Sequence, residues 1–154
     1  MPIIRKSDAP IEQPETPDAL GPYTAALYSD AGGLTQFGAF TETLPPGSRS
    51  SLKHWHVEED EFVFVIEGKV LVHEGDTVTQ IGAGDAACFP ANAPAGHFLE
   101  NTSDADVTYL VVGTRSPRDL VTYPDHDRRL TFDRATKTRI YHTLDGKPAD
   151  APQG

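Results

Sequence analysis

Two histidines and a glutamate lie close together in the sequence and have the side chains needed to bind a metal ion. His54 and His56 are two residues apart, so on an extended strand both imidazoles leave the same face. Glu61 follows after four intervening residues, enough chain to turn and enter an adjacent strand. Two neutral nitrogen donors and one carboxylate would then converge. Such a set suits a divalent cation such as zinc, manganese, iron or nickel, and it leaves coordination positions open for water or substrate.

An alternative interpretation assigns the same residues to a solvated surface. A His-x-His pair beside the acidic run 58–60 is compatible with that, and Asp60 is the alternative ligand if the loop register shifts by one residue. Three further features favour a metal site. Gly47 precedes the histidines after a Pro-Pro turn, Gly68 closes the following strand, and a third histidine, His97, arrives later in a Gly-His-Phe-Leu-Glu-Asn segment.

The spacing of these residues resembles the first sequence motif of the cupin superfamily. That motif is a glycine, a His-x-His pair, a glutamate and a second glycine, and it is matched here by Gly47, His54, His56, Glu61 and Gly68. One departure is that six residues, rather than five, separate Gly47 from His54. Small single-domain bacterial cupins, most of them without an assigned reaction, look closer still, because they share the segment Pro-Pro-Gly-x-Arg-Ser-Ser-Leu-x-His-Trp-His.

The second cupin motif is matched by Gly84, Pro90, His97 and Asn101. Asn92 stands where the motif has its second glycine, and four residues rather than two separate it from His97. Two extra residues lengthen a loop but can preserve the face to which His97 points. The resemblance therefore implies that His97 is a fourth metal ligand, whereas Asn101 is expected to order the turn that follows.

The resemblance implies one divalent metal ion held by His54, His56, Glu61 and His97, with no catalytic residue assigned. Three neutral imidazoles and one carboxylate leave such an ion with a formal charge of about +1, so it remains a Lewis acid. The ligand types do not name the metal, because imidazole suits several first-row ions and occupancy also follows availability.

The amino-acid composition limits the kinds of molecule that the protein is expected to bind. The 154 residues are enough for one domain with its own core, and 13 basic against 23 acidic side chains give a net charge of -10. Such a surface repels phosphate backbones and anionic lipids, so neither nucleic acid nor a membrane is an expected partner. The single cysteine, Cys88, excludes an internal disulfide and is expected to be a small buried hydrophobe. No charged, apolar leader and no apolar run near ~18 residues is visible, so a cytoplasmic protein is expected.

Glycine and proline turns divide the chain into short strand-like segments. Those segments are 23–28, 34–44, 51–56, 61–66, 69–73, 77–81, 86–89, 97–101 and 107–112. They predict an all-β fold, an antiparallel β-barrel or jelly roll, of which the double-stranded β-helix of cupins is one form. The predicted organisation is an N-terminal arm at 1–21, the barrel at 22–113 and a C-terminal tail at 114–154 packed on the barrel, with one possible strand at 139–142.

Strand alternation predicts an apolar outer face. If Glu61 points into the barrel, so do Val63 and Val65, and the opposite face then presents Phe62, Phe64 and Ile66. This is more apolar area than a soluble monomer usually leaves in water. We therefore expect a homodimer interface there.

The other basic residues and histidines that stand out in the sequence are expected at the surface of the protein, not in the metal site. Arg49 and Lys53 precede the ligands and are expected on the solvated surface, although either could hold an acidic group of a substrate. Three further histidines sit among polar residues and are expected at the surface: His73, His126 and His142.

Three functions remain open from the sequence. The first is a metal-dependent enzyme acting on a small polar or acidic molecule; for cupins, the resemblance includes dioxygenases, decarboxylases, lyases and sugar or sugar-phosphate isomerases. The second is a non-catalytic module that binds a small ligand or senses a metal. A third is a metal-free barrel whose histidines are only hydrogen-bonded. A tyrosine, an arginine or a second carboxylate beside the open coordination position would favour catalysis.

Overall fold

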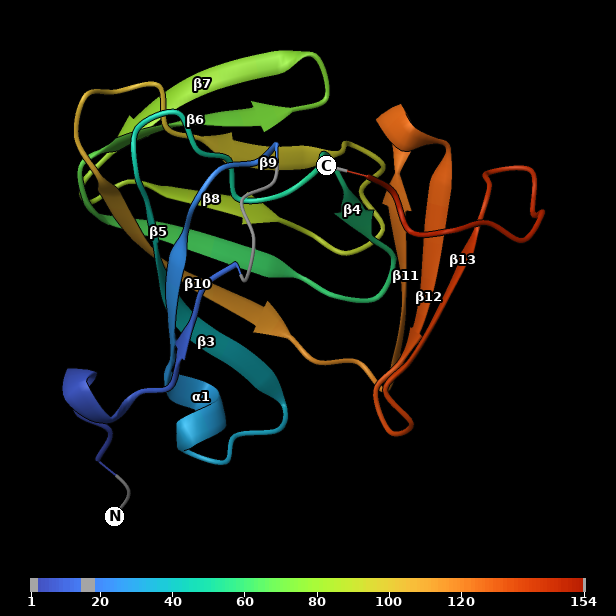
Figure 1. Ribbon diagram of the computed structural model, residues 1–154, viewed down its shortest axis with the longest axis horizontal. Helices are drawn as coiled ribbons and strands as arrows, with labels where there is room; N and C mark the ends of the chain where they lie inside the picture. The colour runs from blue at the N-terminus through green and yellow to red at the C-terminus, as the bar shows by residue number, and fades with distance from the viewer. Residues whose placement is uncertain (1–2, 15–18, 154) are drawn as a thin grey trace.

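The chain folds almost entirely into antiparallel strands. The structure is a computed structural model that describes residues 3–14 and 19–153. Parts of the predicted arm, residues 1–2 and 15–18, and the last residue of the predicted tail lie outside this description. Within the described ranges, one four-residue helix, α1 (Tyr28–Ala31), begins at the last residue of the first predicted strand (Figure 1). None of the helices there is long and apolar enough to cross a membrane.

Each of the nine predicted strand segments contains a strand. The strands are β1 (Ile11–Glu12), β2 (Thr24–Leu27), β3 (Phe37–Leu44), β4 (Trp55–His56), β5 (Glu61–Glu67), β6 (Lys69–Glu74), β7 (Thr77–Gly82), β8 (Ala86–Phe89), β9 (His97–Glu100), β10 (Val107–Thr114), β11 (Arg118–Tyr123), β12 (Arg128–Asp133) and β13 (Thr138–His142). The described residues also contain two short 3-10 helices, η1 (Lys6–Asp8) and η2 (Pro124–His126). The predicted strand at 51–56 is shorter than expected, since only its last two residues belong to a ladder.

The strands form three antiparallel sheets. One has the order β1-β2-β3-β10-β5-β8, a second has the order β7-β6-β9, and the third has the order β13-β12-β11-β4. Apolar side chains from the first two sheets make one core, which includes Leu44, Val65, Val72, Leu99 and Tyr109. Alternation along each strand sends these residues to the same interior, so the predicted antiparallel barrel of the jelly-roll type is confirmed.

The C-terminal segment is more regular than the sequence indicated. The strand expected at 139–142 is present as β13, but β11 and β12 were missed, and the three strands form a sheet that β4 extends (Figure 1). Charged residues interrupt the apolar alternation here, and β11 has the irregular burial pattern of a strand partly covered on both faces. Because Val121 pairs with His56, this sheet is joined to the barrel at a predicted metal ligand. The division into arm, barrel and tail stays a prediction.

The outer face of β5 is as expected from alternation. Val63 and Val65 are fully buried, whereas Phe62, Phe64 and Ile66 are 38%, 37% and 50% exposed. The expectation that Cys88 is buried is wrong. Cys88 is exposed because β8 pairs with β5 in a register that sets Cys88 opposite Phe62, on the outer face.

The homodimer predicted from this face is testable by one charge substitution. Phe64→Arg places a cation in the middle of the apolar face and should convert a dimer of 16.7-kDa chains into monomers, as measured by light scattering coupled to size exclusion. Val78→Arg is the matched control, because Val78 is exposed on β7, outside this face. A monomeric wild-type protein would contradict the dimer.

Candidate metal centre

Three of the residues predicted as ligands form one compact group. The ligand atoms of His54, His56 and Glu61 all lie within 4.8 Å of one another, and all three residues are half-buried. His54 and His56 come from the segment that enters β4, and Glu61 is the first residue of β5. The four residues between His56 and Glu61 therefore turn the chain so that the glutamate lies beside the histidines.

His97, the fourth predicted ligand, lies against this group from β9. Its ring centroid is 4.9 Å from that of His54, and its Nε2 is 3.6 Å from Oε1 of Glu61, too long for a hydrogen bond. Backbone bonds in both directions tie His97 to His54, with N-to-O distances of 3.2 Å and 2.8 Å. The structure thus brings all four predicted residues together from three separate parts of the chain.

The buried Nε2 of His97 has an unusual environment. His97 is 3% exposed, its ring stacks on Phe89 at 3.7 Å between centroids, and Nε2 has no hydrogen-bond partner among the described residues. A buried polar atom without a partner costs about 1–3 kcal/mol. A cation at the centre of the group would give this nitrogen a partner, so the site fits a metal ion.

Hydrogen bonds on the outer side of the rings fix two of the imidazoles. Nδ1 of His54 donates to the carbonyl oxygen of Leu52 at 2.8 Å, and Nδ1 of His56 donates to Oδ2 of Asp119 at 2.6 Å. Asp119 is buried, and its other oxygen accepts from the backbone N–H of Glu58 at 3.0 Å. Because each Nδ1 carries the proton, each Nε2 is left with a lone pair, the arrangement that metal-binding histidines use.

The side chains of the group also shift one another's pKa values. Burial, together with the neighbouring His56 and His97, lowers the pKa of His54 to about 4, so this ring is neutral at pH 7. Burial disfavours the charged form of His56, but the carboxylate of Asp119 outweighs it and raises the pKa of His56. Burial would likewise raise the pKa of Glu61, yet the contact with His97 and the other imidazoles lowers it, so Glu61 is ionised.

Other polar residues near the motif have structural roles. Asp60, the alternative ligand, is exposed and accepts a backbone hydrogen bond from Ala91 at 2.7 Å, outside the group. Asn101 is fully buried, and its amide donates to the carbonyl oxygens of Leu44 and Ala105, so the expectation that it orders the turn is confirmed. Asn92, at the glycine position of the second motif, adopts a left-handed φ of 59°, a conformation that asparagine tolerates.

Three residues expected at the surface also make specific contacts. Arg49 pairs with Glu100 at 2.9 Å, and Lys53 donates to the carbonyl oxygen of Gly75 at 2.6 Å. His73 is half-buried rather than solvated, because its Nε2 lies 2.9 Å from Glu100 and its ring stacks on Phe98 at 4.2 Å. None of these three residues lines the large cavity that opens beside the metal group.

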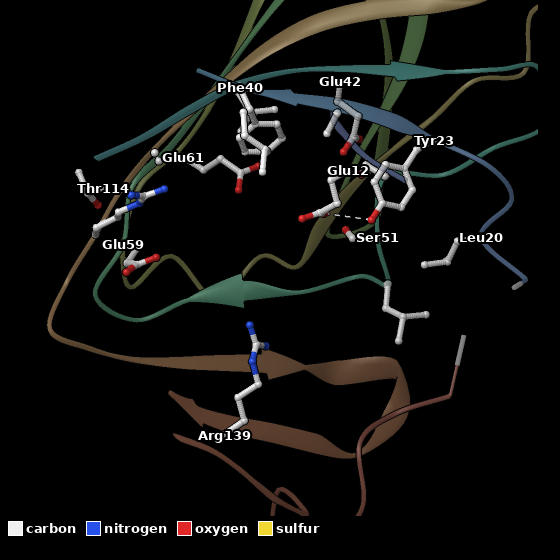
Figure 2. A pocket seen from close by; sticks show the side chains of 18 of the residues that line it. Glu12, Leu20, Tyr23, Phe40, Glu42, Ser51, Glu59, Glu61, Thr114 and Arg139 are labelled. Carbon is white, nitrogen blue, oxygen red and sulfur yellow. Dashed lines mark hydrogen bonds between the residues drawn. The ribbon is translucent and has the colours of Figure 1, made fainter. Parts of the chain in front are cut away.

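A cavity of about 820 Å³ opens beside the group, between the six-stranded sheet and the C-terminal sheet (Figure 2). Glu61 is the predicted ligand that lines it, and the ring of Tyr123 in its wall lies 6.0 Å from that of His54. The wall also carries three guanidinium groups. Two of them are neutralised, since Arg115 pairs with Asp30 and Arg134 with Glu59, whereas Arg139 packs on an aromatic ring.

The whole chain is similar in sequence and fold to a solved cupin structure. A sugar phosphate isomerase of the cupin superfamily from Silicibacter pomeroyi is 35% identical in sequence, over 99% of this chain and 100% of that chain, with a TM-score of 0.87. The family model described as "Cupin domain" matches residues 40–113. This chain belongs to the cupin superfamily.

More distant cupin-like structures share the fold. A putative sugar phosphate isomerase from Acidithiobacillus ferrooxidans is 27% identical over 83% of this chain and 81% of that chain, with a TM-score of 0.74. A protein from Thermotoga maritima described as a predicted oxalate decarboxylase is 23% identical over 74% and 99% of the two chains, with a TM-score of 0.62, which bears on the fold alone. A search of curated proteins finds no significant match.

Sequence reasoning missed several side chains of the cupin site. Asp119 and Arg139 belong to the C-terminal sheet, whose strands β11 and β12 were not predicted, so nothing connected Asp119 with His56 in the sequence. For Glu42, by contrast, the sequence does contain a signal that points to the site. It lies two residues before the buried Leu44 in a predicted strand, so alternation places a carboxylate on the inner face.

The link between Asp119 and His56 leads to a spectroscopic prediction. Asp119→Asn preserves the shape of the side chain but removes the negative charge that raises the pKa of His56 against its burial. The pKa of His56 in the metal-free protein should therefore fall below its wild-type value, as followed by NMR titration of the imidazole nitrogens. Asp133→Asn is the control, because Asp133 pairs with Arg118 at 3.1 Å, away from the group. An unchanged His56 pKa in Asp119→Asn would contradict the assignment.

The same pair gives the stability of the metal-free protein a pH dependence. His56 has a raised folded-state pKa, so its contribution is complete below the unfolded value of about 6.5 and is lost as pH rises through the folded value. Asp119 has a lowered folded-state pKa, so its contribution is present above about 3.9 and is lost as pH falls through the folded value. The pair therefore stabilises most at pH values of about 4 to 6.5.

Proposed function

We propose that this cupin is a metal-dependent isomerase of a phosphorylated sugar, with one divalent ion bound by His54, His56, Glu61 and His97. The observation that carries the proposal is that one cavity contains both Glu61 and a guanidinium group, that of Arg139, with no carboxylate partner among the described residues. The similarity to the Silicibacter pomeroyi sugar phosphate isomerase over the full length of both chains supports the same reaction class.

The donor set fits the chemistry that an isomerase needs. A bound divalent ion would polarise the carbonyl and hydroxyl oxygens of an open-chain sugar. Three features of the described residues suit this ion: the buried Nε2 of His97 has no hydrogen-bond partner among them, and the Nδ1 atoms of His54 and His56 are held by Leu52 and Asp119. Zinc, manganese, iron and nickel all suit three imidazoles and a carboxylate.

The cavity fits a small anionic substrate. Its volume of about 820 Å³ is in the range of small-molecule sites, roughly 300–1,000 Å³. Figure 2 shows Arg139 projecting into this space from the C-terminal sheet, across from Glu61. Its guanidinium lies 4.9 Å from the centroid of the Phe132 ring, which orients the group without neutralising it. A phosphate can accept two parallel hydrogen bonds from such a guanidinium.

The alternative, a non-catalytic ligand-binding or metal-sensing module, receives less support. A sensor needs only a shaped apolar pocket around its ion. Here the cavity wall contains further carboxylates besides Glu61, among them the buried Glu42, and three tyrosines, Tyr23, Tyr123 and Tyr141. Such groups can move protons or bind hydroxyls, which favours catalysis.

Cytoplasmic location and homodimer formation are part of this proposal. The single cysteine, Cys88, is free, which suits a reducing compartment. The exposed apolar face of β5 supports self-association, and a net charge of -10 disfavours nucleic acid and anionic lipid as partners.

The ligand assignment predicts metal content directly. Elemental analysis of the purified protein should find about one divalent ion per chain, and His54→Ala or Glu61→Ala should reduce metal affinity at least about tenfold, because losing even an outer-shell partner has that effect. His126→Ala is the matched control, since His126 lies in η2 and is not part of the group. Metal-free wild-type protein, or full occupancy in both variants, would refute the assignment.

The substrate class predicts a selective effect of Arg139. The wild-type protein, loaded with its metal, should interconvert a phosphorylated aldose and the corresponding ketose, and chelation should abolish the activity. Arg139→Gln should raise KM for the phosphorylated sugar about tenfold or more, the size of one lost charge-assisted contact, while leaving KM for the unphosphorylated sugar unchanged. Arg5→Gln is the control, because Arg5 is exposed near the N-terminus. Equal effects on both sugars would argue against a phosphate contact.

A further inference from the structure

A buried carboxylate lines the same cavity as Glu61 but is not part of the metal group. Glu42 lies on β3, and its side chain points inward because it shares the face of the fully buried Leu44. Only 8% of Glu42 is exposed, and it lines the cavity (Figure 2). A carboxylate in such a position is normally found where it is used, because burying a charged group is costly.

We propose that Glu42, held in place by Tyr109, is the catalytic acid–base group that carries a proton between adjacent carbon atoms of the sugar. This inference rests on the proposed isomerase function and names a residue that the ligand assignment leaves without a role.

Two strands fix the position of the Glu42 carboxylate. Tyr109 of β10 pairs directly with Glu42 in the β3–β10 ladder, and its hydroxyl donates a hydrogen bond to Oε1 of Glu42. Tyr109 is 1% exposed, so its ring cannot move without opening the core. Ser50, which also lines the cavity, hydrogen-bonds to Tyr109. The hydroxyl of Tyr109 therefore orients one carboxylate oxygen of Glu42.

The surroundings of Glu42 also suit proton transfer near neutral pH. Burial raises the pKa of Glu42 to about 7, against the opposing hydrogen bond from Tyr109, and the nearby charges of Glu61 and Glu12 add to the rise. Both protonation states are then populated under ordinary conditions. A group that must remove a proton and return it works best when its pKa is close to the working pH.

The other carboxylates of the cavity are less suited to this role. Glu59 has a cationic partner, because its Oε1 accepts from the guanidinium of Arg134 at 2.6 Å as well as from the backbone N–H of Ser116 at 2.8 Å. Glu12 is exposed on β1 and accepts a hydrogen bond from Tyr23 at 3.1 Å. Asp30 forms an ion pair with Arg115. Glu42 is the remaining one that is both buried and without a cationic partner among the described residues.

The proposed step balances without any further reactant. The ionised carboxylate of Glu42 removes the proton from C2 of the aldose, and the electron pair of the C2–H bond forms a C1–C2 double bond while the carbonyl electrons move to O1. The proton of the O2 hydroxyl passes to O1, the C2 carbonyl forms, and Glu42 returns its proton to C1. The product is the ketose, and nothing is oxidised or reduced overall.

The test uses the metal-loaded full-length protein and a phosphorylated aldose in deuterated water. Glu42→Gln should lower kcat about 100-fold or more, the usual effect of removing a general base, and should stop deuterium incorporation at the transferred carbon. Metal content by elemental analysis should stay at the wild-type level. Glu67→Gln is the matched control, because Glu67 is an exposed strand glutamate that does not line the cavity.

A second variant separates a catalytic role from a structural one. Tyr109→Phe removes the hydrogen bond that favours the ionised form of Glu42, so the acidic limb of the kcat/KM profile should move to higher pH. A group that only supports the fold would leave the limb in place. This measurement also decides the question if Glu42→Gln does not fold.

The outcomes separate this inference from the function on which it rests. If the wild-type protein is active and Glu42→Gln retains kcat within about threefold, the role of Glu42 is refuted and the isomerase function stands. Loss of metal from Glu42→Gln, or an unmoved acidic limb in Tyr109→Phe, also refutes it. If the wild-type protein isomerises no phosphorylated sugar, the proposed function fails and the role of Glu42 fails with it.

Discussion

The backbone pairing of His54 with His97 is the contact on which the site depends. These two residues exchange N–H to O=C hydrogen bonds in both directions, with N-to-O distances of 3.2 and 2.8 Å, although 42 residues separate them in the sequence. Residues directly opposite in an antiparallel pair have Cβ atoms about 4.5–5.5 Å apart, so two imidazoles at such positions face one point. His56 then follows by alternation and Glu61 by the return of the chain into β5. One short bridge therefore sets the geometry of four side chains.

The C-terminal sheet adds further side chains to the site that the bridge between His54 and His97 positions. Strand β11 pairs with β4 beside His56, and the same strand supplies the buried Asp119 that orients the ring. Strand β13 supplies Arg139 at the opposite wall of the cavity. The barrel alone would leave the cavity beside Glu61 without the wall to which Tyr123 and Arg139 belong. Within this fold, the C-terminal strands are part of the candidate site, because they contribute both a hydrogen bond to a candidate ligand and the unpaired guanidinium group of the cavity wall among the described residues.

Local patterns were enough to predict the barrel and the grouping of His54, His56 and Glu61, because both depend on residues that are close in the sequence. The alternation in 61–66, the turns at Gly47 and Gly68, and the parity of His54 and His56 each depend on a few neighbouring residues. The contacts of Asp119 and Tyr109 span 63 and 67 residues, and no periodic pattern encodes which distant strand a polar residue will meet. Cys88 was misplaced for the same reason, because the face to which it points is set by its pairing with β5.

Burial of the Glu42 carboxyl group lowers the stability of the folded protein near neutral pH. This cost is an argument that Glu42 is present for a functional reason. Its folded-state pKa of about 7 lies above the unfolded value, so the unfolded chain ionises first as pH rises, and stability falls between about pH 4.5 and 7. That shift corresponds to roughly 3 kcal/mol at neutral pH, which is a large part of the 5–15 kcal/mol by which a domain is usually stable. An apolar residue at this inward position of β3 would pack against the core without that cost. Proteins retain such destabilising groups where the reaction requires them, and Glu42 combines this cost with access to the cavity that contains Glu61.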